Sequence, residues 1–170
     1  MALNENGKVT HMVLDDSIPL LVSTQVQSLL EERGIREEDI RAVIFCAENG
    51  RQFHTHVPTG RRLAYLAPAK VTYWVEYEPE GGGYRIYNAY SHRMRLLHGF
   101  NMPSKKARTE TDWLCVACGL HLEVATVKLA YLDETFAVDL PACPTCQRVL
   151  VNEEQAVVKM ALAERMLEDK

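Results

Sequence analysis

Two short stretches decide how the C-terminal part of this chain folds: Cys115-Val116-Ala117-Cys118-Gly119 and Cys143-Pro144-Thr145-Cys146. Two cysteines separated by two residues can turn both sulfurs toward one point, because the residues between them form a tight turn. Gly119 can take the backbone angles that such a turn needs, and Pro144 fixes one dihedral angle of the second turn. The sequence therefore predicts that all four sulfurs meet around one metal ion.

The 24 residues between the two pairs suit a two-stranded excursion that brings the pairs together. We expect one strand at 124–131, a turn at 132–134 and a returning strand at 135–140. Four thiolates in a tetrahedron suit zinc, and iron in a rubredoxin-like site is the alternative. Redox dithiols or unrelated cysteines remain a further interpretation. A closed four-thiolate zinc site performs no chemistry and replaces a core that a small module cannot build.

The residues before this module predict two helices followed by an antiparallel β-meander. Apolar residues at helical spacing indicate helices at 20–32 and 37–48. Strands are expected at 62–67, 71–77 and 84–90, with a glycine-rich turn at 78–83. Residues 91–97 are expected either to continue the hairpin or to form a further strand. The first 14 residues are expected to form either a loose terminus or an edge strand at 9–14. The predicted fold class is α+β, with a zinc-ribbon-like module and a C-terminal helix at the end.

The organisation expected from these patterns is an α+β domain at 1–98, a linker at 99–111 and the four-cysteine metal domain at 112–170. The linker is expected because 99–111 has no apolar periodicity. The final helix is expected from Asn152 to about Leu167, with a stripe formed by Val158, Ala161, Leu162, Arg165 and Met166.

Composition limits the classes of function. Hydrophobic residues make up 47% and charged residues 25% of the 170, which is typical of a globular chain. No apolar run is long enough to cross a bilayer and no signal peptide is evident, so a cytoplasmic location is expected. The net charge is −4, and residues 113–170 carry five basic against nine acidic side chains. This acidic balance disfavours nucleic-acid binding, although a ribbon module, an aromatic hairpin and Lys105, Lys106 and Arg108 keep it as a hypothesis.

Several weaker candidates lie outside the cysteines. Tyr90, His92, Arg93 and Arg95 combine residue types that bind anionic ligands, although a charged edge strand explains them equally. His54 and His56 would share one face of a strand and could chelate a metal, with solvent-exposed polar residues as the other interpretation. His98 follows the hairpin. Cys46 is expected to be an inert thiol on the second helix. No catalytic motif is present, so an enzyme is the less favoured class.

The C-terminal sequence resembles a known group of proteins. The resemblance rests on the order Trp113–Gly119, Val127–Leu132, Phe136–Val138, Cys143–Cys146, Leu150-Val151 and the closing helix Glu153–Lys170. The group comprises small proteins from anaerobic bacteria, described as redox proteins or zinc-ribbon domains of unknown function. Their genes lie near those of molybdenum-dependent aldehyde or xanthine oxidoreductases.

The resemblance covers about residues 112–170 and implies that Cys115, Cys118, Cys143 and Cys146 are the metal ligands. Gln147 departs from the glycine that often follows the last cysteine in this group, which disfavours a rubredoxin-like iron site. The function expected is a non-catalytic, zinc-binding accessory or adaptor protein with a protein partner, and a homodimer is conceivable. A rubredoxin-like iron electron carrier is the alternative, and a nucleic-acid-binding ribbon protein is the second alternative.

Overall fold

The computed structural model of the protein describes residues 18–103 and 110–169, and the side chains of 98–103 are not described. Within these residues, nine strands form one sheet in the order β1-β5-β4-β3-β2-β7-β8-β6, and β9 pairs with the other side of β8. All pairings are antiparallel except that of β1 with β5. The α+β class with a largely antiparallel sheet is therefore confirmed. The strand expected at 9–14 lies outside the described residues.

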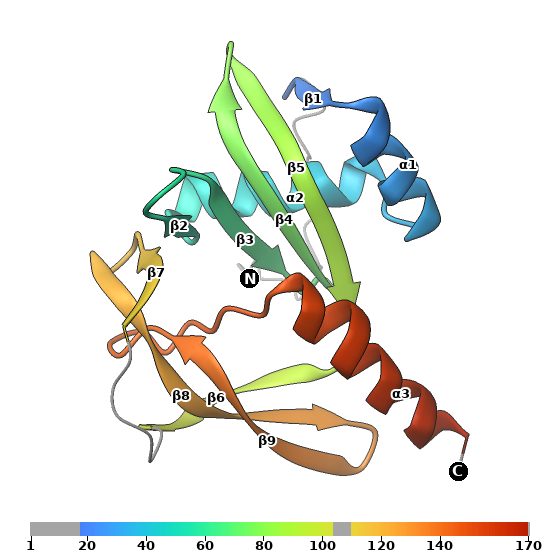
Figure 1. Ribbon diagram of the computed structural model, residues 1–170, viewed down its shortest axis with the longest axis vertical. Helices are drawn as coiled ribbons and strands as arrows, with labels where there is room; N and C mark the ends of the chain where they lie inside the picture. The colour runs from blue at the N-terminus through green and yellow to red at the C-terminus, as the bar shows by residue number, and fades with distance from the viewer. Residues whose placement is uncertain (1–17, 104–109, 170) are drawn as a thin grey trace, which may run out of the picture.

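The N-terminal half contains two helices and the first five strands (Figure 1). Their bounds are β1 Leu20–Val22, α1 Thr24–Glu32, α2 Glu37–Gly50, β2 His54–His56, β3 Arg62–Leu66, β4 Thr72–Glu80 and β5 Gly83–His92. The first turn of α2 carries three acidic residues, which stabilise the positive end of the helix dipole. Helix α2 ends at Gly50 and is capped by Arg51, which has a left-handed φ of 49°.

The C-terminal half contains the remaining strands and the last helix. These elements are β6 Arg95–Pro103, β7 Glu110–Cys115, β8 Leu120–Tyr131, β9 Glu134–Ala142, the π-helix η1 Glu154–Met160 and the α-helix α3 Ala161–Glu168. Strand β8 is long enough to pair with β7 along its first residues and with β6 further on, while β9 follows its other edge. None of the helices described within 18–103 and 110–169 combines the length and apolarity that crossing a bilayer requires.

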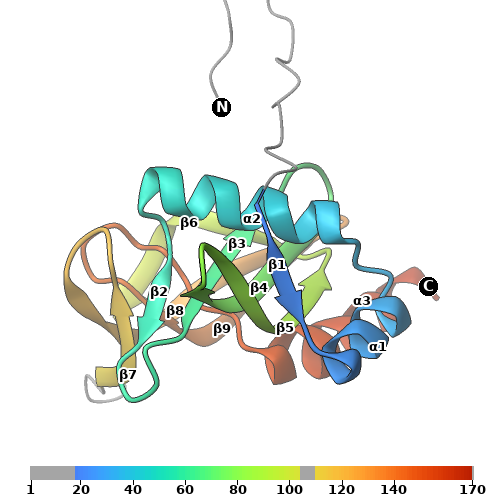
Figure 2. The same cartoon turned by 90° about the horizontal axis from the view of Figure 1, so that it is seen from above.

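The β4–β5 hairpin has a separate hydrophobic core on each face. Helix α2 lies across one face (Figure 2), where Val43 and Ile44 pack with Val75 and Tyr77. On the other face, Trp74 packs in a cluster with apolar residues of the C-terminal half. Both faces are buried because successive side chains of a strand alternate, so that Trp74 enters one core and Val75 enters the other.

The first predicted helix begins too early. Residues Leu20–Val22 form strand β1, which pairs in parallel with β5, and the helix begins only at Thr24. The boundary is set by Ser23, whose hydroxyl accepts a hydrogen bond from the backbone N–H of Val26 at 3.3 Å. Apolar spacing alone cannot distinguish Leu20 and Leu21 on a strand from the first turn of a helix.

The C-terminal helix buries a face other than the stripe predicted from the sequence. The expected stripe is largely solvent-exposed: Val158, Leu162 and Met166 are 58%, 52% and 63% exposed. The buried side chains are instead Ala156, Met160 and Glu164. The buried face combines two apolar side chains with a carboxylate, a combination that the spacing of apolar residues alone does not indicate.

The sheet crosses the expected boundary between the two halves. Strand β2 pairs with β7, and β6 extends through residue 103 into the segment expected as a linker. Residues 104–109 lie outside the described part of the chain. The division into domains at 98 and 112 stays a prediction.

A buried indole–imidazole hydrogen bond connects the two strands of the hairpin. Trp74 Nε1–H donates to His92 Nε2 at 3.0 Å, and both side chains are buried. Burial lowers the pKa of His92 below its ordinary value of 6.5. An imidazolium at this position would also lose its ability to accept the indole hydrogen bond.

We expect this histidine to make stability fall in mild acid. The unfolded chain takes up a proton near pH 6.5 and the folded chain resists it, so the stabilisation is present above that pH and is lost as the pH falls. The check is urea unfolding at about pH 7.5 and about pH 5.5, followed by tryptophan fluorescence, in the wild type and in His92→Gln. The wild type should lose more stability between the two conditions than the variant, and equal losses would contradict this account.

Candidate metal centre

The four cysteines of the two C-x-x-C pairs come together in space. Cys115 ends β7 and Cys118 lies in the turn before β8, whereas Cys143 and Cys146 lie in the loop after β9. All four sulfurs lie within 4.8 Å of one another, and the Sγ atoms of Cys115 and Cys146 are 3.7 Å apart. A tetrahedral ion with metal–sulfur bonds of about 2.3 Å has sulfur–sulfur edges of about 3.8 Å. The sulfurs therefore fit one tetrahedral metal ion.

Both turns use the same backbone conformation. The N–H of Gly119 donates to the carbonyl of Cys115 at 2.8 Å, and the N–H of Gln147 donates to the carbonyl of Cys143 at 3.0 Å. The residue after each pair is left-handed, with φ of 67° at Gly119 and 60° at Gln147. Gln147 thus takes the conformation that a glycine would take, at a steric cost that glycine does not have.

Substitutions at these two matched positions should have opposite effects. Gly119→Ala is expected to destabilise the protein by about 1 kcal/mol, because alanine is strained at the left-handed φ of this position. A steric clash does not contribute, since no neighbouring atom lies within 4 Å of the added Cβ. Gln147→Gly is expected to be neutral or to stabilise by up to about 1 kcal/mol. Chemical denaturation of the metal-loaded proteins measures both, and equal destabilisation by the two changes would contradict the shared turn geometry.

The four neighbouring thiols cannot all ionise unless a cation lies between them. Burial raises the pKa of Cys115 to about 12. The pKa of Cys118 is raised by its hydrogen bond with the Cys146 thiol and then by burial. Burial alone would raise the pKa of Cys146, but hydrogen bonds from the Arg148 backbone and the neighbouring thiols lower it. Four thiolates this close repel one another, so a divalent cation is needed for all of them to ionise.

One edge of the centre reaches the surface. Cys115 and Cys143 are fully buried, Cys118 is half-buried and Cys146 is exposed. Beside Cys146 lies a cavity of about 290 Å³ that is also lined by Gln52, Tyr65 and Arg148. The Arg148 guanidinium lies 6.0 Å from the Tyr65 ring centre, and its Nη1 donates to the Gln52 side-chain oxygen at 3.4 Å. The centre thus has two buried cysteines, one half-buried cysteine and one exposed cysteine.

The N-terminal half supports the centre through β2. His54 lies opposite Cys115 in the β2–β7 pair, and its Nε2 lies 3.3 Å from the carbonyl of Val149. That carbonyl can only accept, so Nε2 carries the proton and Nδ1, which is buried, has no partner among the described residues. Burial lowers the pKa of His54 to about 4. His54 is therefore a neutral side chain that connects the second cysteine loop to the sheet.

The other histidine and cysteine candidates do not join the metal cluster. His56 Nδ1 contacts the Thr59 hydroxyl at 2.8 Å, and its ring lies 4.9 Å from that of Trp113. Among the described residues, the four cysteines are the group placed to hold a metal ion. Cys46 is half-buried on α2, and burial raises the pKa of its thiol. The side chain of His98 lies outside the described residues.

The four residues predicted to bind an anion, Tyr90, His92, Arg93 and Arg95, lie at two different places in the structure. Tyr90 is buried and its hydroxyl donates to the carbonyl of Val151 at 2.8 Å, while His92 accepts from Trp74. Both of these side chains belong to the core between the two halves. Arg93 and Arg95 instead line one cavity near the end of α3. Three of the six hairpin aromatics, Trp74, Tyr77 and Tyr90, are buried.

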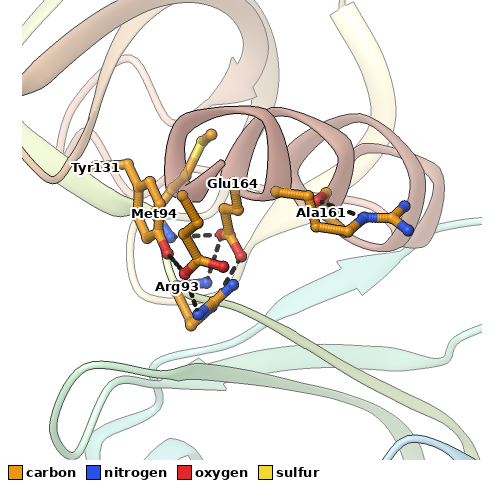
Figure 3. A network of polar contacts seen from close by, with 7 residues as sticks. Arg93, Met94, Tyr131, Ala161 and Glu164 are labelled. Atoms are coloured by element: carbon orange, nitrogen blue, oxygen red, sulfur yellow. Dashed lines mark hydrogen bonds and ion pairs between the residues drawn. The ribbon is translucent and has the colours of Figure 1, made fainter. Parts of the chain in front are cut away.

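Sequence reasoning missed a buried carboxylate on α3. Glu164 is 4% exposed and accepts hydrogen bonds from the backbone N–H groups of Arg93 and Met94 at 2.7 and 2.9 Å. Its second oxygen accepts from Arg93 Nε at 3.1 Å (Figure 3). In the sequence, Glu164 appears only as a glutamate among apolar residues of a helix. Its partners, Arg93 and Met94, lie about 70 residues earlier in the chain.

Comparison with known proteins reaches only the C-terminal part of the chain. A family model described as a domain of unknown function, DUF7479, matches residues 111–170. This segment contains all four cysteines, β8, β9 and the last helix. No curated protein and no solved structure shows significant similarity to the chain.

Proposed function

We propose that this chain is a non-catalytic accessory protein that holds one structural zinc ion between Cys115, Cys118, Cys143 and Cys146. The observation that carries the proposal is the approach of four sulfurs from two separate turns to within 4.8 Å. Zinc bound by four thiolates has no open position for a substrate, so its contribution is to fix the two turns against each other. Two knuckles joined through the β8–β9 hairpin also support a zinc-ribbon-like module.

The exposed surface of the last helix supports an adaptor role. Val158, Leu162 and Met166 follow one another at intervals of four residues and are more than half exposed. Such a row lies on one side of a helix and is a feature of surfaces that bind proteins. We further propose that the partner belongs to a molybdenum-dependent oxidoreductase system, which rests on the resemblance of residues 112–170.

The adaptor role is tested by affinity purification of the full chain from its native cells, with Leu162→Glu as the matched variant. The expected result is a molybdenum-dependent oxidoreductase or a maturation factor that is recovered with the wild type and lost with the variant. Recovery of an unrelated protein contradicts the proposed system. A wild-type chain that is monomeric and recovers nothing contradicts the adaptor role.

Iron bound to the same sulfurs is the competing function, because the exposed Cys146 brings one ligand to the surface. An electron carrier needs such an accessible edge. Elemental analysis and the visible spectrum of natively purified protein separate the two. A colourless protein with one zinc per chain supports the structural role, and a coloured protein with one iron per chain supports the electron carrier.

A further inference from the structure

A second cavity, of about 530 Å³, lies at the other end of the C-terminal half. It is bordered by the loop before β4, the start of β6, the β8–β9 turn and the end of α3, and its charged lining residues are Lys70, Arg93, Arg95 and Glu168. Its volume is in the range of small-molecule sites, which is about 300–1,000 Å³. None of the four cysteines lines it, so it is separate from the metal centre.

Arg93 is held in one orientation at this cavity. Its Nε donates to the buried Glu164, its Nη1 donates to Glu168 at 2.5 Å, and its guanidinium lies 5.5 Å from the centre of the Tyr131 ring. The Tyr131 hydroxyl donates to the same carboxylate of Glu168. These contacts use Nε and Nη1, and Nη2 has no hydrogen-bond partner within the described residues. A guanidinium fixed in this way loses little entropy when a ligand binds to it.

Two further cations at the cavity are not neutralised. Lys70 and Arg95 are exposed, and neither pairs with a carboxylate in the part of the chain that the structure describes. The formal charges of Lys70, Arg93, Arg95, Glu164 and Glu168 sum to +1 in a chain whose net charge is −4. Positive charge without a protein partner is therefore concentrated here against the trend of the whole molecule.

The rim of the cavity carries an apolar residue in an unfavourable conformation. Leu132 occupies the β8–β9 turn with φ of 51°, and its side chain is 62% exposed. Glycine or asparagine is the usual residue at such a position, since a large side chain costs free energy there. Leu132 therefore places an apolar side chain at the cavity entrance without a packing contribution that explains its cost.

We propose that this cavity binds a small organic phosphate. The phosphoryl oxygens accept hydrogen bonds from Arg95, Lys70 and the open Nη2 of Arg93, and the organic part of the ligand lies against Tyr131 and Leu132. A phosphate monoester suits three cationic donors better than a carboxylate, because it has three terminal oxygens and close to two negative charges.

The probe is phenyl phosphate, titrated into isotopically labelled full-length protein and followed by the amide resonances. Saturable shifts are expected at Lys70, Arg93, Arg95 and Leu132. The double variant Lys70→Ala/Arg95→Ala should bind at least about tenfold more weakly, because it lacks two charge-assisted donors. Benzoate, which has the same ring and a carboxylate, should bind about tenfold more weakly than phenyl phosphate. Inorganic phosphate should also bind more weakly, since it lacks the apolar part.

The control variant removes the same charge elsewhere on the molecule. Lys159 and Arg165 lie on η1 and α3 and do not line the cavity. Lys159→Ala/Arg165→Ala should retain the wild-type affinity. The proposal is overturned by an absence of saturable binding, by shifts that centre elsewhere, by equal weakening in the two double variants, or by benzoate or inorganic phosphate binding as tightly as phenyl phosphate.

Discussion

Replacement of Cys143 by serine is expected to remove the bound metal and to unfold the C-terminal half. Cys143 is 1% exposed, and the contacts that hold its loop to the sheet include the sulfur cluster, the Ala142–Val149 bridge and the His54–Val149 hydrogen bond. Structural zinc contributes roughly 10–16 kcal/mol of binding free energy in small zinc domains. This is comparable to the roughly 5–15 kcal/mol by which a whole domain is stable. The metal content per chain and the hydrogen-exchange protection of β8 and β9 measure the effect.

The matched control is Cys46→Ser, which also replaces one thiol. Cys46 lies on α2, away from the sulfur cluster, so this variant should retain one metal ion per chain and the wild-type protection pattern. Removal of the metal from the wild type with a strong chelator should reproduce the Cys143→Ser behaviour. A Cys143→Ser protein that keeps both its metal and its stability would show that the four sulfurs do not act as one site.

Replacement of Glu164 by alanine should cost about 2–4 kcal/mol of unfolding free energy, mainly because two backbone N–H groups lose their acceptor. The Arg93 side chain is 43% exposed, so the loss of its ion pair adds little. The variant leaves Arg93 without its buried partner and removes the acceptor of two backbone N–H groups. Because those groups lie between β5 and β6, the contact of α3 with the sheet should loosen as well. Chemical denaturation measures the loss, and exchange of the Arg93 and Met94 amides locates it.

Two further variants separate charge from packing at this position. Glu164→Gln keeps the shape and one carbonyl acceptor, so it should be destabilised less than the alanine variant. Glu154→Ala removes a carboxylate that is 67% exposed and pairs with Lys159, and an exposed pair of this kind contributes about 0–1 kcal/mol. Equal effects of the Glu164→Ala and Glu154→Ala changes would mean that the buried network does not hold the helix.

The sequence predicted the parts of the structure that depend on local chemistry. The spacing of the two C-x-x-C pairs and the length between them were enough to predict that the sulfurs meet, because tight turns and a hairpin leave few other arrangements. Helix α2 and the β4–β5 hairpin were also predicted close to their observed bounds, since each has clear turn or stop residues at its ends. Four thiolates can bind either zinc or iron, so the identity of the metal does not follow from the positions of the sulfurs, and zinc stays a prediction.

The features that sequence reasoning missed depend on contacts between distant residues. Glu164 could not be recognised as a buried group because its partners, Arg93 and Met94, are fixed only by the complete fold. Strand β1 was predicted as helix because three residues carry too little periodicity to define an element. The pairing of β2 with β7 was missed for the same reason, as His54–His56 is also only three residues long.

The pairing of β7 and β8 with strands from earlier in the chain has a practical consequence for truncation. A fragment that starts at residue 111 would contain every metal ligand but neither β2 nor β6, and two rows of backbone hydrogen-bonding groups would lose their partners. Open edges of this kind promote self-association, so we expect the excised fragment to aggregate even when it is loaded with metal. Proteins that share only this segment would then need another protection of the same edges, such as further strands, a covering helix or charged side chains.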